Sequence, residues 1–156
     1  MDRLAPQLAT TQVNHETQSA AGPAGSPAGR APLASAALVI HSMAAGGGER
    51  VVAHIATGLV QRSVRTMVIC LAEAGPLAGQ VESAGAQLAV IGSNKGYDFG
   101  AIGRLAKTLR RFGPEVINCH DRSSLPYVVL ANCFAGRRPV VYTAHGLLYN
   151  ADREPR

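Results

Sequence analysis

The chain of 156 residues has the length of a single domain with room for a tail. Of its residues 47% are apolar but only 4% are aromatic, and Trp is absent, so the core must consist mostly of Val, Leu, Ile and Ala. No apolar run approaches the roughly 20 residues that a bilayer span needs. Residues 1–10 also lack the cationic start and apolar stretch of a secretory signal, so we expect neither feature.

The formal net charge is +5, and residues 1–35 are balanced, which places the positive charge in the remainder. Such a surface attracts phosphates, anionic lipid or nucleic acid, and charge alone does not choose among them. The three cysteines, Cys70, Cys119 and Cys133, stand among apolar residues without a C-x-x-C pair or metal-ligand spacing. This pattern predicts reduced core thiols in a cytoplasmic protein.

Residues 1–34 are rich in Ala, Gly, Pro, Ser, Thr and Gln and show no hydrophobic period. Such a segment cannot bury enough apolar surface to offset its ordering entropy. We therefore expect a disordered tail over residues 1–34, followed by a Rossmann-like domain over residues 35–156.

From residue 36 onward, apolar runs alternate with segments of helical spacing. The pattern predicts strands at 36–42, 64–71, 87–91, 115–119 and 139–143, and helices at 49–62, 77–84, 99–112 and 124–134. Short buried strands joined by helices imply right-handed crossovers and a parallel sheet. The fold class is therefore α/β, a doubly wound Rossmann-like sheet with strand order 3-2-1-4-5 and a switch point between the first and fourth strands.

One edge of this predicted sheet gathers the polar and glycine-rich segments. Ligands of open parallel sheets bind beyond the carboxyl ends of the strands, at the switch point. The first, fourth and fifth strands are expected to be neighbours there, and their carboxyl ends carry Gly46-Gly47-Gly48, His120-Asp121 and His145-Gly146. The sequence therefore predicts a ligand site at this edge.

The three glycines open directly into a helix, whose N-terminus offers free N–H groups and partial positive charge to a phosphate. A plain tight turn is the alternative. The glycines match neither G-x-G-x-x-G nor G-x-x-x-x-G-K-[ST], because Glu49 and Arg50 follow Gly48. Glu73, near the end of the second strand, keeps a ribose-binding interpretation open, and Glu49 is expected to complement the helix dipole.

His145 leaves its strand at this edge, where a neutral imidazole can hydrogen-bond a sugar hydroxyl or transfer a proton. His120 has the same two interpretations, a site role or a structural one, and Asp121 either binds ligand or caps the helix that begins near Ser124. The seryl residues lack a G-x-S-x-G elbow, and no metal-ligand spacing is present, so we predict neither a catalytic triad nor a metal site. The remaining histidines are interpreted as structural: His15, His41 and His54.

The helix predicted at 99–112 carries Arg104, Lys107 and Arg111 opposite its apolar face. A solvated surface is the first interpretation, and contact with anionic lipid headgroups is the second. Nucleic-acid binding is not expected, because no aromatic residues interleave with these charges.

Three segments carry a resemblance to a known family. Residues 39–50 resemble a strand followed by G-G-x-E, and residues 111–120 resemble "R-x-x-x-P-D-hydrophobic-hydrophobic-H-x-H", with Glu115 for Asp and Asn118 for the first His. Residues 139–146 resemble "P-hydrophobic-hydrophobic-x-T-x-H-G". In this order, over residues 36–150, the chain resembles the N-terminal, acceptor-side domain of glycosyltransferase family 4, which is one half of a GT-B fold.

The resemblance implies transfer of a sugar, typically a hexose, from a nucleotide-sugar co-substrate to a lipid, saccharide or other acceptor. It implies retention at the anomeric carbon, no cofactor and usually no metal. Carried over by position, Gly47 and Gly48 would bring N–H groups to the donor diphosphate or acceptor, His145 would face the transferred sugar, and His120 would line the acceptor side.

The family's donor-binding half would follow beyond residue 156. We therefore expect a fragment or truncated product with little activity by itself, whose missing C-terminal domain acts in cis or in trans. The alternatives are a non-catalytic subunit of a split transferase and an unrelated nucleotide-binding Rossmann domain. Peripheral contact with an anionic membrane, at its inner face, is the further partner that the basic helix suggests.

Overall fold

The computed structural model describes residues 31–93 and 98–145. The tail predicted over residues 1–34 lies almost entirely outside these residues and stays a prediction. Within them, strands and helices alternate as the sequence predicts. The elements are β1 (Ser35–Ser42), α1 (Gly47–Gln61), β2 (Arg65–Glu73), α2 (Ala78–Ser83), β3 (Gln87–Val90), α3 (Phe99–Phe112), β4 (Val116–His120), α4 (Leu125–Phe134) and β5 (Val140–Thr143).

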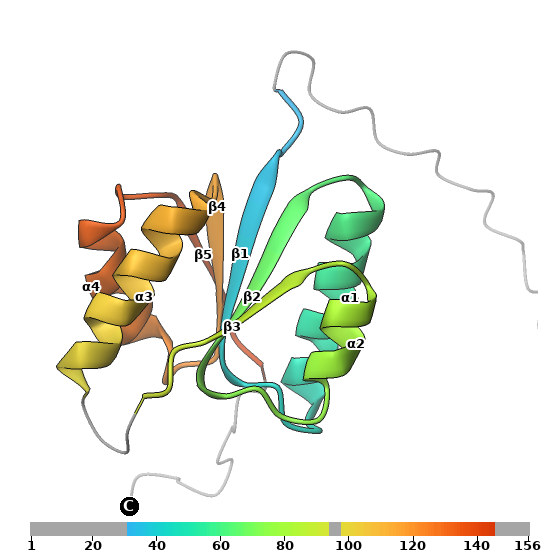
Figure 1. Cartoon of the computed structure of the whole chain (residues 1–156), viewed down its shortest axis with the longest axis horizontal. Coiled ribbons are helices and arrows are strands. Elements are labelled where there is room, and N and C mark those ends of the chain that lie inside the picture. The colour runs from blue at the N-terminus through green and yellow to red at the C-terminus, as the bar shows by residue number, and fades with distance from the viewer. Residues whose placement is uncertain (1–30, 94–97, 146–156) are drawn as a thin grey trace, which may run out of the picture. The chain divides into compact units, whose positions relative to one another are not determined.

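The strands form one parallel sheet in the order β3-β2-β1-β4-β5, which confirms the predicted topology. The register of β1 aligns Leu38 with Val68 of β2 on one side and with Asn118 of β4 on the other. As Figure 1 shows, α1 and α2 lie on one side of the sheet, and α3 and α4 lie on the other. From β1 the chain adds β2 and β3 on one side and then returns to add β4 and β5 on the other, so the switch point lies between β1 and β4.

Successive residues of β1 supply two separate cores, one beneath each pair of helices. Leu38 and Ile40 pack in the core under α1 and α2, whereas Ala37 and Val39 pack in the core under α3 and α4. This division follows from the two-residue period of a strand, which sends alternate side chains to opposite faces. Because both faces are covered, the central strands are apolar throughout, and polar chemistry is confined to the strand ends.

The α3 helix has the boundaries that its sequence predicts, and both ends have a local cause. The Asp98 carboxylate accepts a hydrogen bond from the Ala101 backbone N–H at 2.9 Å, so it caps the N-terminus. Gly113 adopts the left-handed conformation (φ 62°) and donates its N–H to the Leu109 carbonyl, which ends the helix.

The α1 helix begins two residues earlier than expected. Gly46 is the extended N-cap, and Gly47 and Gly48 form the first turn, rather than a loop that precedes the helix at Glu49. The first intrahelical hydrogen bond joins the Arg50 N–H to the Gly46 carbonyl at 3.3 Å. Glycine has low helix propensity, so spacing alone placed this boundary too late.

The prediction that all three cysteines are core residues is wrong for Cys133. Cys70 and Cys119 are buried, and burial raises the pKa of their thiols to about 11 and about 12. Cys133 is exposed on α4. That helix is apolar on nearly every side, so its sequence does not indicate which side faces the sheet.

Candidate functional site

The loops after β1, β4 and β5 surround a hollow of about 320 Å³ at the predicted edge of the sheet. Its walls come from segments far apart in the sequence: the end of β1, the start of α1, the turn after β4 and His145, two residues after β5. The lining residues are Ile40, His41, Ser42, Gly48, Glu49, Asp121, Ser123 and His145. The structure therefore brings the three predicted segments together.

The glycine turn, Gly46–Gly48, presents backbone to the hollow at Gly48. N–H groups in the first turn of a helix have no intrahelical acceptor, and the helix dipole adds partial positive charge there. A Cβ atom added at Gly48 would lie 3.0 Å from Cγ of His145, whereas one added at Gly47 would meet nothing within 4 Å. A side chain at Gly48 would therefore require the imidazole of His145 to move.

The turn after β2 supports the glycine turn from behind. The Met43 N–H donates to the Ala74 carbonyl at 3.1 Å, and the Met43 carbonyl accepts from the Leu77 N–H at 3.0 Å. Gly75 has φ 71°, and a Cβ atom there would overlap the Met43 carbonyl group. The loop that leads to the glycine turn is therefore fixed by a second glycine that sequence reasoning did not single out.

His145 forms the opposite wall, and His120 lies behind it. Nδ1 of His120 and Nε2 of His145 are 2.7 Å apart, which requires one ring to donate and the other to accept. The rings are stacked at 11°, with centroids 5.0 Å apart. His120 is 0% exposed and does not line the hollow, so it acts behind His145 rather than beside it.

Burial keeps His120 neutral. Desolvation and, to a smaller extent, the nearby His145 together lower the pKa of its imidazole from 6.5 to about 4, against an opposing effect of Asp121. Among the residues that the structure describes, none hydrogen-bonds Nε2 of His120. A buried N–H group without a hydrogen-bond acceptor is rarer in proteins than a buried acceptor without a donor. We therefore assign the tautomer in which Nε2 of His120 carries no proton and Nδ1 donates its proton to His145.

Asp121 lines the hollow directly after β4. It has a left-handed backbone (φ 74°), a conformation that Asp tolerates better than most residues. Its Oδ2 accepts from the His41 backbone N–H at 2.8 Å and from the Ser124 hydroxyl at 3.0 Å. Its Oδ1 accepts from the Ser123 hydroxyl at 2.6 Å and from the Ser124 N–H at 2.8 Å. The carboxylate thus holds the turn before α4, close to the capping interpretation, and ties it to β1.

The remaining residues that the sequence singled out differ in whether they line the hollow. Gly46 and Gly47 lie in the glycine turn but do not line the hollow, and Gly146 lies outside the described residues. Glu49 lies in the first turn of α1, as expected for a carboxylate that complements the dipole, and it also lines the hollow. Glu73 is exposed at the end of β2 and is absent from the lining of the hollow.

Sequence reasoning missed His41, Ser42 and Ser123, all of which line the hollow. The register between β1 and β2 shifts between Ile40 and Ser42, and such an irregularity re-aims side chains at a sheet edge. The sequence carries no signal for that shift, because the run from residue 36 to 42 reads as a regular strand. Across 31–93 and 98–145, no group of three or more His, Cys, Asp or Glu side chains is arranged to hold a metal ion.

A parallel sheet in the order 3-2-1-4-5, covered by helices on both faces, defines a Rossmann-like α/β domain. The family model described as Glycosyltransferase Family 4 matches residues 45–156. The chain therefore belongs to glycosyltransferase family 4, as its sequence motifs indicate.

The fold is also similar to a solved structure, the crystal structure of a glycosyltransferase from Rickettsia africae ESF-5. The two share 17% sequence identity with a TM-score of 0.60. The similarity covers 76% of this chain and 32% of that one, so the chain spans about a third of the length of that glycosyltransferase. No curated protein matches the chain.

Proposed function

We propose that this domain is the acceptor-side half of a glycosyltransferase that moves a sugar from a nucleotide-sugar to an acceptor. The observation that carries the proposal is the contact between Gly48 and the ring of His145 at the switch point. Backbone N–H groups and an imidazole face one hollow there. The backbone N–H groups suit phosphate oxygens, and the imidazole suits sugar hydroxyls.

In this proposal the glycine turn takes the donor diphosphate or the acceptor. Gly47 and Gly48 present no side chain, so an anionic group can approach the N–H groups closely. Glu49, at the rim of the same hollow, disfavours a second anion beside it and so restricts where the charged group binds.

His145 faces the transferred sugar, and His120 positions it. With the His120 proton on Nδ1, the Nε2 atom of a neutral His145 accepts, and the proton of His145 resides on its own Nδ1. His145 is then a hydrogen-bond donor toward a sugar hydroxyl. In this assignment His120 acts through His145 rather than lining the acceptor side directly, because it is fully buried.

Family membership supports a proposal for the finer features of the reaction. We propose retention at the anomeric carbon, a hexose as the transferred sugar, no metal requirement and a lipid or saccharide acceptor. We also propose that a donor-binding half, in the same polypeptide or on a second chain of a split transferase, completes the site and excludes water from it. The length relation to the Rickettsia africae glycosyltransferase supports this arrangement.

The test has two parts on the purified 156-residue chain. With panels of nucleotide-sugars and acceptors, we expect little or no transfer, and robust transfer would show that the half-site proposal is wrong. In NMR titrations with the same nucleotide-sugars, the resonances of Gly48 and His145 should shift, and Gly48→Ala should abolish the shift while Gly79→Ala, on α2, should not. Tighter binding of a dinucleotide than of any nucleotide-sugar would instead support a plain nucleotide-binding domain.

A further inference from the structure

An apolar groove runs along the outer seam of α3 and α4, on the side of these helices away from the sheet. It has a volume of about 790 Å³ and is lined by Phe99, Ile102, Gly103, Ala106, Leu130 and Phe134, with Lys107 and Arg110 as its charged members. Phe99 is 78% exposed and Phe134 is 65% exposed, although both are large aromatic side chains. None of the residues described as lining the groove is acidic.

The exposed side of α4 is as apolar as its buried side. Val128 and Ala131 are buried against the sheet, whereas Val129 and Leu130 are 49% and 46% exposed. A helix that is apolar all round is ordinarily covered on every side. Contiguous exposed apolar surface of this kind marks a contact with a protein or a membrane.

The charge of the molecule distinguishes between these partners. Residues 98–138 have a net charge of +4, out of +5 for the whole chain, whereas residues 47–83, which include α1 and α2, are neutral. The charged residues between 98 and 138 are the cations Arg104, Lys107, Arg110, Arg111, Arg122, Arg137 and Arg138 and the acids Asp98, Glu115 and Asp121. Two of these cations, Lys107 and Arg110, line the apolar groove itself.

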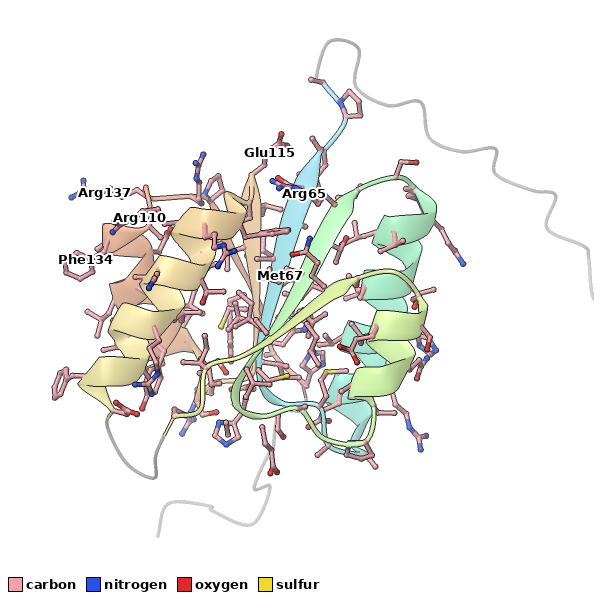
Figure 2. The ribbon with its side chains drawn as sticks, in the orientation of Figure 1. Arg65, Met67, Arg110, Glu115, Phe134 and Arg137 are labelled. Atoms are coloured by element: carbon pink, nitrogen blue, oxygen red, sulfur yellow. The ribbon has the colours of Figure 1, made fainter. Side chains whose placement is uncertain are left out.

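The cations beside the groove differ from those that the helix pattern singled out. The Arg104 guanidinium donates to the carbonyls of Ile91 and Gly92 and pairs with Asp98 at 3.0 Å, so it is a structural residue. Arg111 lines a separate hollow beside Arg65. Lys107 and Arg110 line the groove, and Arg110 also donates to the Phe134 carbonyl at 2.7 Å. Figure 2 shows Arg110 and Phe134 at the end of the two helices where α3 and α4 finish.

We propose that the α3–α4 face docks on an anionic lipid bilayer, with Phe99 and Phe134 inserted among the acyl chains and Lys107 and Arg110 at the headgroups. A surface helix with basic residues beside exposed aromatics binds membranes through electrostatic attraction to anionic lipids and through burial of apolar surface. The seam begins at Phe99, at the same edge of the sheet as the candidate site, because α3 runs opposite to the strands. Docking on this face therefore leaves the hollow open beside the membrane surface, within reach of a lipid-borne group.

The first test measures binding of the full chain to vesicles of phosphatidylcholine alone or with phosphatidylglycerol. We expect binding only to the anionic vesicles and a loss of binding as NaCl rises. Lys107→Gln should weaken binding about fivefold, since one cation near such a surface contributes that much. Phe134→Ser should weaken it about tenfold through lost apolar burial. The matched controls lie on α1, where Arg50→Gln removes an exposed cation and Val51→Ser removes an exposed apolar side chain. Both variants should bind the vesicles like the original chain.

The second test uses the absence of Trp from the chain. In Phe134→Trp the new indole is the sole Trp, and its emission should shift to shorter wavelength with anionic vesicles and be quenched by brominated acyl chains. Val51→Trp should show neither effect.

Equal binding to both vesicle types, or unchanged binding by Lys107→Gln and Phe134→Ser together, would overturn the proposal. So would a concentration-dependent dimer abolished by Phe134→Ser, or binding of an acidic polypeptide that vesicles do not displace. The assays require no turnover, so their outcome is independent of whether the chain transfers sugar.

Discussion

The two walls of the candidate site are built on different physical principles. On one side, the glycine turn at the start of α1 presents backbone, and its shape depends on the absence of side chains at Gly48 and at the supporting Gly75. On the other side, His120 and His145 present imidazole, and their arrangement depends on burial and on a single proton between two rings. The backbone wall should therefore respond to added atoms, and the histidine wall should respond to pH.

The largest expected effect comes from breaking the support of the backbone wall. Gly75→Ala should lower the free energy of unfolding by about 4 kcal/mol, because the added methyl overlaps the Met43 carbonyl and φ is 71°. Urea unfolding measures this value. The control is Gly79→Ala, where an added methyl meets nothing within 4 Å and should instead stabilise α2 by about 0.5 kcal/mol. Similar behaviour of the two variants would show that the support is dispensable.

The burial of His120 should make the protein less stable in acid. The unfolded chain binds a proton at His120 below pH 6.5, whereas the native chain binds it only below about 4. Between these values the unfolded state carries more protons, so stability falls as pH drops from 6.5 to 4, by about 3 kcal/mol in total. Urea unfolding across this range should show that loss in the original chain and in His54→Gln but not in His120→Asn. An identical profile for His120→Asn would contradict the assigned pKa.

Weakening the link between β1 and the turn before α4 should have an intermediate effect. Asp121→Asn keeps a side chain that tolerates φ 74° but replaces one carboxylate oxygen with an NH₂ group. Both carboxylate oxygens of Asp121 accept hydrogen bonds, so in either orientation of the amide the NH₂ group faces donors. Two hydrogen bonds are lost, so we expect a destabilisation of about 2 kcal/mol. Hydrogen exchange should speed up at the His41 amide, which donates to this carboxylate. Ser123→Ala, which removes one bond, should lose about 1 kcal/mol and leave the His41 amide protected.

The smallest effect is expected where the walls touch. Gly48→Ala should destabilise by about 1 kcal/mol, because the ring of His145 must shift to admit a methyl 3.0 Å from its Cγ. Gly47→Ala, one residue earlier, meets nothing within 4 Å and should gain about 0.5 kcal/mol in helix propensity. Thermal unfolding compares the two directly, and the chemical shifts of the His145 ring should change only in Gly48→Ala. Equal melting temperatures would mean that the two walls are not in contact.

The fold was predictable because its signals are local and repeated. Buried apolar runs fixed the five strands, and the Asp98 and Gly113 ends of α3 lie where the sequence places them. The chirality of parallel crossovers then led to the strand order, and with it to the edge where Gly48, Asp121 and His145 meet.

What the sequence did not reveal depends on contacts between distant residues. No local pattern distinguishes Gly75, which lies against Met43, from an ordinary turn glycine. The burial of His120 depends on the packing of β4, α4 and the segment that carries His145, so the relation between the two imidazoles needed coordinates. The outward surface of α4 was hidden because an evenly apolar helix has no period that identifies its exposed side.

The guanidinium of Arg104 holds the carbonyls of Ile91 and Gly92 on one side and the carboxylate of Asp98 on the other. These contacts clamp both ends of the β3–α3 connection independently of its length. Because doubling the length of a closed loop adds only about 0.6 kcal/mol, an epitope tag or a small reporter domain inserted between Gly92 and Asp98 should leave both flanking elements in register. The β3–α3 connection is therefore a suitable site for a label, because an insertion there does not alter the sequence of the glycine turn or of the segments that carry the two imidazoles.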